Sequence, residues 1–166
     1  MLRFPNDTFY LTTTRFNNET YKQNERYRIN NDIDGCVYGT PYEMPSYIPL
    51  HAKVFVLEMN NEINSIMGIG LIKNIPKINS FQVYDEKNYN RYVFMGEYRI
   101  DRKEMDKDEE TIMKVFDILC FKGNKHMKRG QGLKCFPQEM LFKMSQRIDL
   151  VEFISNMFKK RIKSNT

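Results

Sequence analysis

A glycine-rich segment spanning residues 122–132 offers the clearest binding chemistry in the sequence. It holds four cationic side chains and three glycines within eleven residues. Glycines let backbone N–H groups approach a phosphate closely, and the cations neutralise its charge. Arg129 can also pair with a phosphate or a guanine edge through two nitrogens. The alternative is an exposed basic loop without a specific ligand. The candidate binding residues here are Lys122, Lys125, Lys128, Arg129 and Gln131.

A second candidate lies near the N-terminus, in the polar stretch 12–24. Its arginine and asparagine side chains can hydrogen-bond base edges, and an aromatic ring such as that of Tyr21 can stack on a base. The alternative is structural, with an asparagine capping a helix and the rings of Phe16 and Tyr21 packing in the core. We keep both interpretations open here. The candidate residues are Arg15, Asn17, Asn18 and Tyr21.

A third candidate lies in the segment 30–49, which contains three prolines and an Asp-Gly pair and is expected to be a long loop. Within it, Tyr38 and Tyr42 are candidates for the aromatic walls of a binding pocket. Tyrosines in a proline-bounded loop are equally compatible with a lid over the core.

The charge distribution favours a polyanionic partner. The chain has a formal net charge of +5, and residues 121–166 hold eleven Lys/Arg against three Asp/Glu. That region therefore carries +8, and residues 1–120 carry the difference, −3. A localised basic surface is typical of nucleic-acid binders. The alternative is a solvated surface whose lysines and asparagines reflect codon bias.

Catalysis has little support in the sequence. There is no Gly-x-Ser-x-Gly, no phosphate-binding Walker loop and no His-Glu-x-x-His, and only two histidines are present. The acidic residues between 106 and 110 suit the first turn of a helix better than a Mg²⁺ site. We therefore predict a protein that is not an enzyme, with no catalytic residue, no metal and no cofactor.

Three cysteines without paired spacing argue against a disulfide framework and favour a reducing, intracellular compartment, the cytoplasm or nucleus. No apolar run reaches the ~18 residues of a membrane span, and no signal-peptide pattern is present. We expect no membrane partner.

Length and patterning predict a single α+β domain over residues 1–158, followed by a frayed basic tail over 159–166. The elements expected from hydrophobic periodicity and turn residues are strands at 9–14, 52–59, 63–74, 80–84 and 92–100, and helices at 20–28, 106–119 and 136–157.

The order of these segments resembles the PUA-like superfamily, especially its EVE and YTH branches. The resemblance rests on the strand and polar helix at 9–28, on the strand pair Lys53–Glu58 and Ile66–Ile72 with its Gly-Ile-Gly, and on the strand-then-helix at 129–140. It implies a small open β-barrel with packed helices and a C-terminal helix. The Asn- and Lys-rich composition also resembles that of proteins from large DNA viruses.

The resemblance implies recognition of nucleic acid, often of a modified base held in an aromatic pocket. YTH-type cages usually contain tryptophan, and this chain has none, so any cage here must use Tyr or Phe. We predict a nucleic-acid-binding module, with RNA favoured over DNA. The main alternative is an interaction or structural protein of a virus particle or regulatory complex, with a surface rich in Met and aromatic residues for a protein partner. A nucleic-acid-processing enzyme is the least supported reading.

Overall fold

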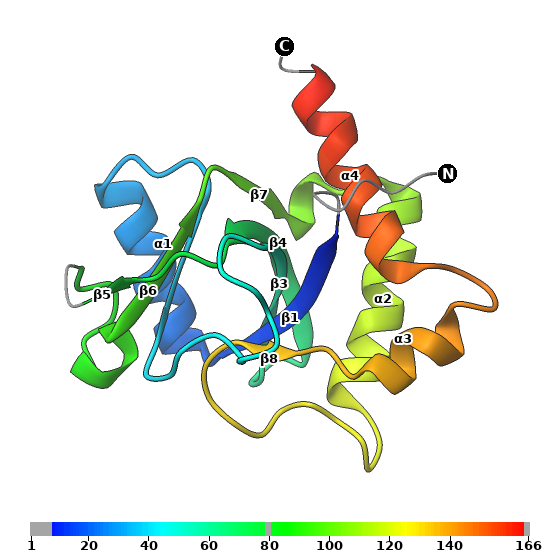
Figure 1. Cartoon of the computed structure of the whole chain (residues 1–166), viewed down its shortest axis with the longest axis horizontal. Coiled ribbons are helices and arrows are strands. Elements are labelled where there is room, and N and C mark those ends of the chain that lie inside the picture. The colour runs from blue at the N-terminus through cyan, green and yellow to red at the C-terminus, as the bar shows by residue number, and fades with distance from the viewer. Residues whose placement is uncertain (1–7, 79–80, 165–166) are drawn as a thin grey trace.

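A computed structural model describes residues 8–78 and 81–164 (Figure 1). The strands are β1 (Phe9–Phe16), β2 (Cys36–Thr40), β3 (Lys53–Asn60), β4 (Ser65–Lys73), β5 (Lys77–Ile78), β6 (Tyr92–Gly96), β7 (Tyr98–Asp101) and β8 (Lys134–Cys135). The helices are α1 (Asn18–Asn30), α2 (Lys107–Phe121), α3 (Gln138–Met144) and α4 (Leu150–Ser164), with short 3-10 turns η2 (Lys87–Asn90) and η3 (Arg102–Glu104).

A mixed five-stranded sheet forms the centre, in the order β7-β4-β3-β1-β8. Strands β1 and β3 run parallel, from the pair Phe9 and Lys53 at one end to the pair Phe16 and Asn60 at the other. A parallel pair needs a crossover connection, and α1 followed by β2 provides it. The carboxyl ends of β1 and β3 therefore meet at one edge of the sheet, beside the start of α1.

Both faces of this sheet are covered, which explains why β3 is apolar almost throughout. Phe55 and Leu57 of β3 pack with α2 and α4, whereas Val54 and Val56 pack toward a second, three-stranded sheet of order β2-β6-β5. Figure 1 shows α2, α3 and α4 on one side and α1 with β5 and β6 on the other. The predicted α+β class with a C-terminal helix is confirmed. The described strands form two sheets and no closed barrel.

The expected single strand over 92–100 is wrong, because it is two strands in two different sheets. β6 ends at Gly96 and β7 begins at Tyr98. A side chain at Gly96 would collide with the backbone of Leu71 in β4, so this glycine lets the chain cross from one sheet to the other. The expected loop over 30–49 also contains a strand, β2, which pairs with β6.

The expected strand over 80–84 is absent from its described part, residues 81–84, while Ser80 lies outside the described residues. The Asn90 side chain explains this. Its Oδ1 accepts hydrogen bonds from the backbone N–H groups of Val83 and Tyr84, and its Nδ2 donates to the Tyr84 carbonyl. These are the groups that a strand ladder would use.

The expected helix over 136–157 is interrupted after Met144. The Ser145 hydroxyl donates to the Phe142 carbonyl, and Asp149 accepts from the N–H of Glu152, which starts α4 anew. Helix α4 then continues to Ser164, through residues expected to be frayed, while residues 165 and 166 lie outside the described chain.

The second glycine of the Gly-Ile-Gly in β4, Gly70, is explained by close packing between the two sheets. A Cβ at Gly70 would overlap the Tyr38 hydroxyl and lie 2.8 Å from the Cys36 sulfur. We predict that Gly70→Ala destabilises the fold by about 1–3 kcal/mol, because the interior has no room for the methyl group. Urea unfolding measures the change. An unchanged midpoint would contradict this packing.

The thiols of Cys36 and Cys120 are buried, and burial raises the pKa of each to about 12. Since the thiolate is the reactive form, we expect both cysteines to resist iodoacetamide at pH 8 in the folded protein and to react in guanidinium. Peptide mass mapping reads out the modified residues. Rapid alkylation of Cys36 in the folded chain would contradict its placement.

Candidate nucleic-acid interface

A pocket of about 280 Å³ opens at the carboxyl ends of β1 and β3. Ligand sites in sheets with parallel strands commonly lie at this edge. The pocket brings together parts of all three segments that sequence analysis selected, although they are far apart in the chain. Its lining residues are Thr14, Arg15, Phe16, Asn17, Thr20, Gly39, Pro41, Asn61, Tyr84, Tyr89, Gly130, Gln131 and Gly132.

Arg15 is the only cation lining this pocket among the described residues, and its guanidinium is incompletely paired. Its Nε donates to the Met127 carbonyl over 2.6 Å and its Nη2 to the Thr13 hydroxyl over 2.9 Å, while Nη1 is buried without a partner. No carboxylate of residues 8–78 or 81–164 forms an ion pair with it. Burial lowers the pKa of the Arg15 guanidinium, because removing this charged group from water costs free energy. A hydrogen-bond acceptor bound beside it would offset that cost.

Asn61 lines the same pocket and carries a second unpaired polar atom. Its Nδ2 donates to the Lys128 carbonyl over 2.9 Å, which fixes the amide orientation and leaves Oδ1 as the other atom. That oxygen is also buried without a hydrogen-bond donor. The pocket is therefore lined by two residues that each carry an unpaired polar atom, one a donor and one an acceptor.

Tyr84 and Tyr89 form an aromatic wall that sequence analysis missed. Their rings meet edge to face with centroids 6.3 Å apart. Tyr84 is held in place because its hydroxyl accepts from Asn24 Nδ2 over 2.9 Å. Tyr84 is the last residue of the segment misread as a strand, and Tyr89 lies in the turn at 85–90 that follows it. The only available signal was the tyrosine spacing around this turn.

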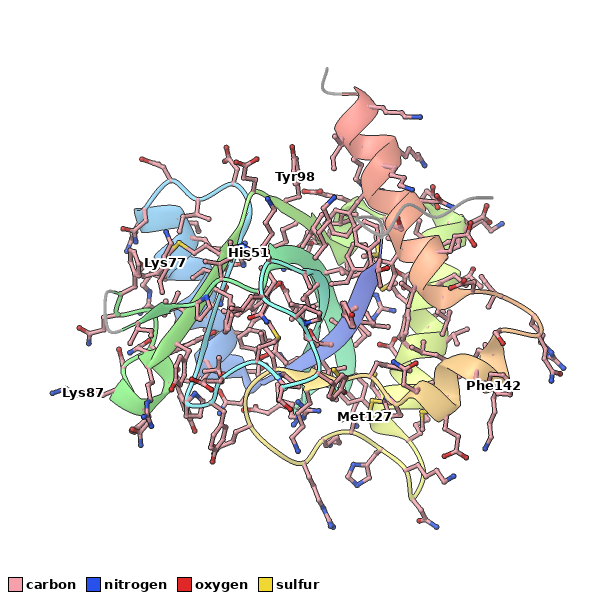
Figure 2. All side chains as sticks on the ribbon, viewed as in Figure 1. His51, Lys77, Lys87, Tyr98, Met127 and Phe142 are labelled. Carbon is pink, nitrogen blue, oxygen red and sulfur yellow. The ribbon has the colours of Figure 1, made fainter. Side chains whose placement is uncertain are left out.

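The glycine-rich loop closes one side of the pocket through residues 130–132. Gly130 and Gly132 adopt φ values of +101° and +77°, which glycine tolerates best. The loop is anchored by Met127, labelled in Figure 2, whose N–H donates to the Cys120 carbonyl. Of the predicted loop residues, Gln131 lines the pocket. The pocket lining does not include the four cations of the loop, Lys122, Lys125, Lys128 and Arg129. The Nζ of Lys125 lies 3.9 Å from Oε1 of Glu139.

Asn17 and Asn18 have structural roles as well as a place near the pocket. Asn17 is the N-cap of α1, and its Oδ1 accepts from the Thr20 N–H over 2.8 Å, as the structural alternative predicted. Asn18 bonds Glu62 and Asn60 through its side chain. Only Asn17 of the two lines the pocket.

We predict that Asn17→Ala lowers the free energy of unfolding by about 1 kcal/mol, since the cap of α1 is lost. Asn17→Asp retains an accepting oxygen and serves as the control, with little change expected. Thermal unfolding measures both variants. Equal losses in the two would contradict a capping role.

The three tyrosines selected from the sequence, Tyr21, Tyr38 and Tyr42, lie in different environments. Tyr38 is only 1% exposed and its hydroxyl donates to Glu58, so its ring is part of the core and not a pocket wall. Tyr21 is half-buried, packs edge to face on Phe16 and accepts from Arg99, as the structural reading expected. Tyr42 is 59% exposed and lines a shallow depression beside Gly130 and Gln131, next to the pocket.

In the part of the chain that the structure describes, no group of three or more His, Cys, Asp or Glu side chains is placed to hold a metal ion. Over the same residues, no helix is both long and apolar enough to span a membrane.

Comparison with known proteins identifies no relative, so the site is interpreted from its geometry alone. No family model, no curated protein and no solved structure matches this chain.

Proposed function

We propose that this chain is a nucleic-acid-binding module, with RNA favoured over DNA, and that its pocket holds one unpaired base. The observation that carries the proposal is Arg15, a half-buried cation whose buried Nη1 has no hydrogen-bond partner and which has no ion-pair partner among the described residues. A base or phosphate acceptor at this position would complete its hydrogen bonds. Asn61 Oδ1 would accept from a base N–H, so that one base edge would satisfy both residues.

The dimensions of the pocket favour an unpaired base over a duplex. Its volume of about 280 Å³ is near the lower end of small-molecule sites. Bases within a duplex are stacked and paired, so only a splayed base can enter such a pocket. Tyr84 and Tyr89 would supply stacking surface, which is sequence-tolerant because every base has a π-face.

The basic loop would follow the backbone of the bound strand. Lys122, Lys128 and Arg129 form no ion pair with a described carboxylate. They precede Gly130, which lines the pocket, in the same loop. Once a base occupies the pocket, these cations would contact neighbouring phosphates and release counterions.

We also propose that the fold is a variant of the PUA-like type, with its two sheets packed as an open barrel. The strand pair β3 and β4, with Gly68 and Gly70, and the α1 connection support this relationship. A modified base would then be a natural ligand, read by Tyr84 and Tyr89 in place of the missing tryptophans.

A salt titration tests the proposal. Fluorescence anisotropy would follow binding of one sequence as single-stranded RNA, single-stranded DNA, and their duplexes, from 20 to 200 mM salt. We expect single-stranded RNA to bind most tightly. A plot of log K against log salt would have a slope of about −2.8 if all four loop cations pair with phosphates. Absence of binding at the lowest salt would overturn the proposal.

Modified oligonucleotides test the base-reading part separately. Single-stranded RNAs carrying N6-methyladenosine or unmodified adenosine at one central position would be compared. Tighter binding of the methylated strand supports modified-base reading, whereas equal binding leaves general single-strand recognition as the function.

The alternative reading, an interaction or structural protein, stays a prediction. An exposed apolar patch combined with a basic loop far from any pocket would favour it, whereas Gly130 and Gln131 of this loop line the pocket.

A further inference from the structure

A second cavity, larger than the proposed nucleic-acid pocket, lies at the opposite end of the parallel strands. It has a volume of about 610 Å³, well within the range of small-molecule sites. It lies between the sheet and the C-terminal half of α4, and its walls are mostly apolar. The side chains that define it are Phe9, Phe55, Leu71, Met95, Phe158 and Ile162.

The apolar walls are well ordered by aromatic stacking. The Phe55 ring stacks on Phe9 with centroids 4.7 Å apart and on Phe158 with centroids 5.3 Å apart. This row of three rings runs from the sheet to α4. Phe55 and Phe158 are buried, at 0% and 3% exposure, so the row is a rigid backing of the cavity. The apolar surface open to a ligand comes from half-buried side chains, namely Phe9, Leu71, Met95 and Ile162.

Four lysines surround this apolar surface, namely Lys53, Lys73, Lys77 and Lys159, and Glu97 is the only acidic residue lining the cavity in the described chain. None of the four forms an ion pair with a described carboxylate. Instead the ammonium of Lys53 lies 5.6 Å from the centre of the Phe9 ring, and that of Lys77, labelled in Figure 2, lies 4.0 Å from the Met95 sulfur. Among the described residues, the rim therefore carries four positive charges against the single negative charge of Glu97.

We propose that this cavity binds a single-chain amphiphile with an anionic head, such as a free fatty acid. The hydrocarbon chain would lie against Phe9, Leu71 and Ile162, and the carboxylate would lie among the rim lysines. Both halves of the ligand are needed, because the walls favour an apolar chain and the rim favours a negative head.

This site is independent of the proposed nucleic-acid pocket. Phe9 and Lys53 pair at the amino ends of β1 and β3, whereas Phe16 and Asn60 pair at their carboxyl ends. At about 3.3 Å per residue, the eight residues of β1 separate the two sites by roughly 23 Å. Failure of one proposal leaves the other intact.

Isothermal titration calorimetry of the full chain with decanoate and with decyltrimethylammonium tests the proposal, since the two probes share a chain length and differ in head charge. We expect saturable one-to-one binding of decanoate, and affinity that rises about fourfold per added methylene from octanoate to dodecanoate. The cationic probe should bind at least tenfold more weakly. No decanoate binding, or equal binding of both probes, would overturn the proposal.

Two charge reversals locate the head group. Lys73→Glu, at the rim, should weaken decanoate binding about fivefold. Lys87→Glu, an exposed residue of η2 outside the cavity (Figure 2), is the matched control and should leave affinity unchanged. Equal effects of the two substitutions would show attraction by net charge alone and would contradict a site at this cavity.

Discussion

Replacing Arg15 with methionine is expected to weaken binding of single-stranded RNA by about 10- to 100-fold. Hydrogen bonds to a charged group contribute about 1.5–3 kcal/mol, and a guanidinium in a partly desolvated pocket has few water molecules to compete with the ligand. Arg15 is the residue whose buried Nη1 lacks a partner. Methionine keeps an unbranched chain of similar length while it removes the charge and every donor.

The same charge change elsewhere provides the control. Arg26 lies exposed on α1 and outside the pocket lining, so Arg26→Met should change affinity less than twofold at constant salt. Thermal unfolding of both variants checks that each is folded, since Arg15 also bonds the Met127 carbonyl. If the two substitutions weaken binding equally, the effect is one of net charge and Arg15 does not contact the ligand.

Replacing Arg99 with methionine is expected to lower the free energy of unfolding by about 3–5 kcal/mol. Arg99 and Glu58 form a two-bond ion pair, with N–O distances of 2.7 and 2.9 Å, and their side chains are 6% and 2% exposed. Tyr38 donates to the same carboxylate over 2.6 Å. Without Arg99, Glu58 would be a buried charge with no cation beside it, which is the costly case for a buried pair.

A double substitution separates this cause from lost packing. Arg99→Met combined with Glu58→Met removes both charges, so it should recover most of the loss seen for Arg99→Met alone. Arg147→Met, on the exposed segment between α3 and α4, is the surface control and should change stability by less than about 0.5 kcal/mol. Urea unfolding measures all three. A double variant less stable than Arg99→Met would show that the pair is not the source of the cost.

Of the candidate residues selected from the sequence, only Arg15, Asn17 and Gln131 line the pocket. The polar residues after the first strand indicate a helix cap, and the glycines after the basic run indicate a turn of the backbone. One residue from each signal, Asn17 and Gly130, lines the pocket. Which side chains face the pocket could not be predicted in the same way. Tyr38 lies in a strand that pairs with β6, and its direction depends on that distant partner.

The fold shows the same division between local and long-range causes. Helix α2 has a capping box at Asp106 and Glu109, a signal contained in four consecutive residues, and it was expected almost within its observed bounds. The crossing from β6 to β7 at Gly96 depends on the backbone of β4, which lies far away in the sequence. Periodicity alone cannot distinguish one strand from two strands in different sheets.

Nuclear magnetic resonance of the ¹⁵N-labelled chain with a short single-stranded RNA tests the central claim most directly. We expect the largest changes in backbone amide chemical shift at saturation on Asn61, on Tyr84 and Tyr89, and on residues 130–132, all of which line one pocket. The Arg15 side-chain Nε–H signal should move with them. Shifts confined to α4, which carries Lys159, Lys160 and Arg161, with the pocket amides unchanged, would contradict binding at the pocket.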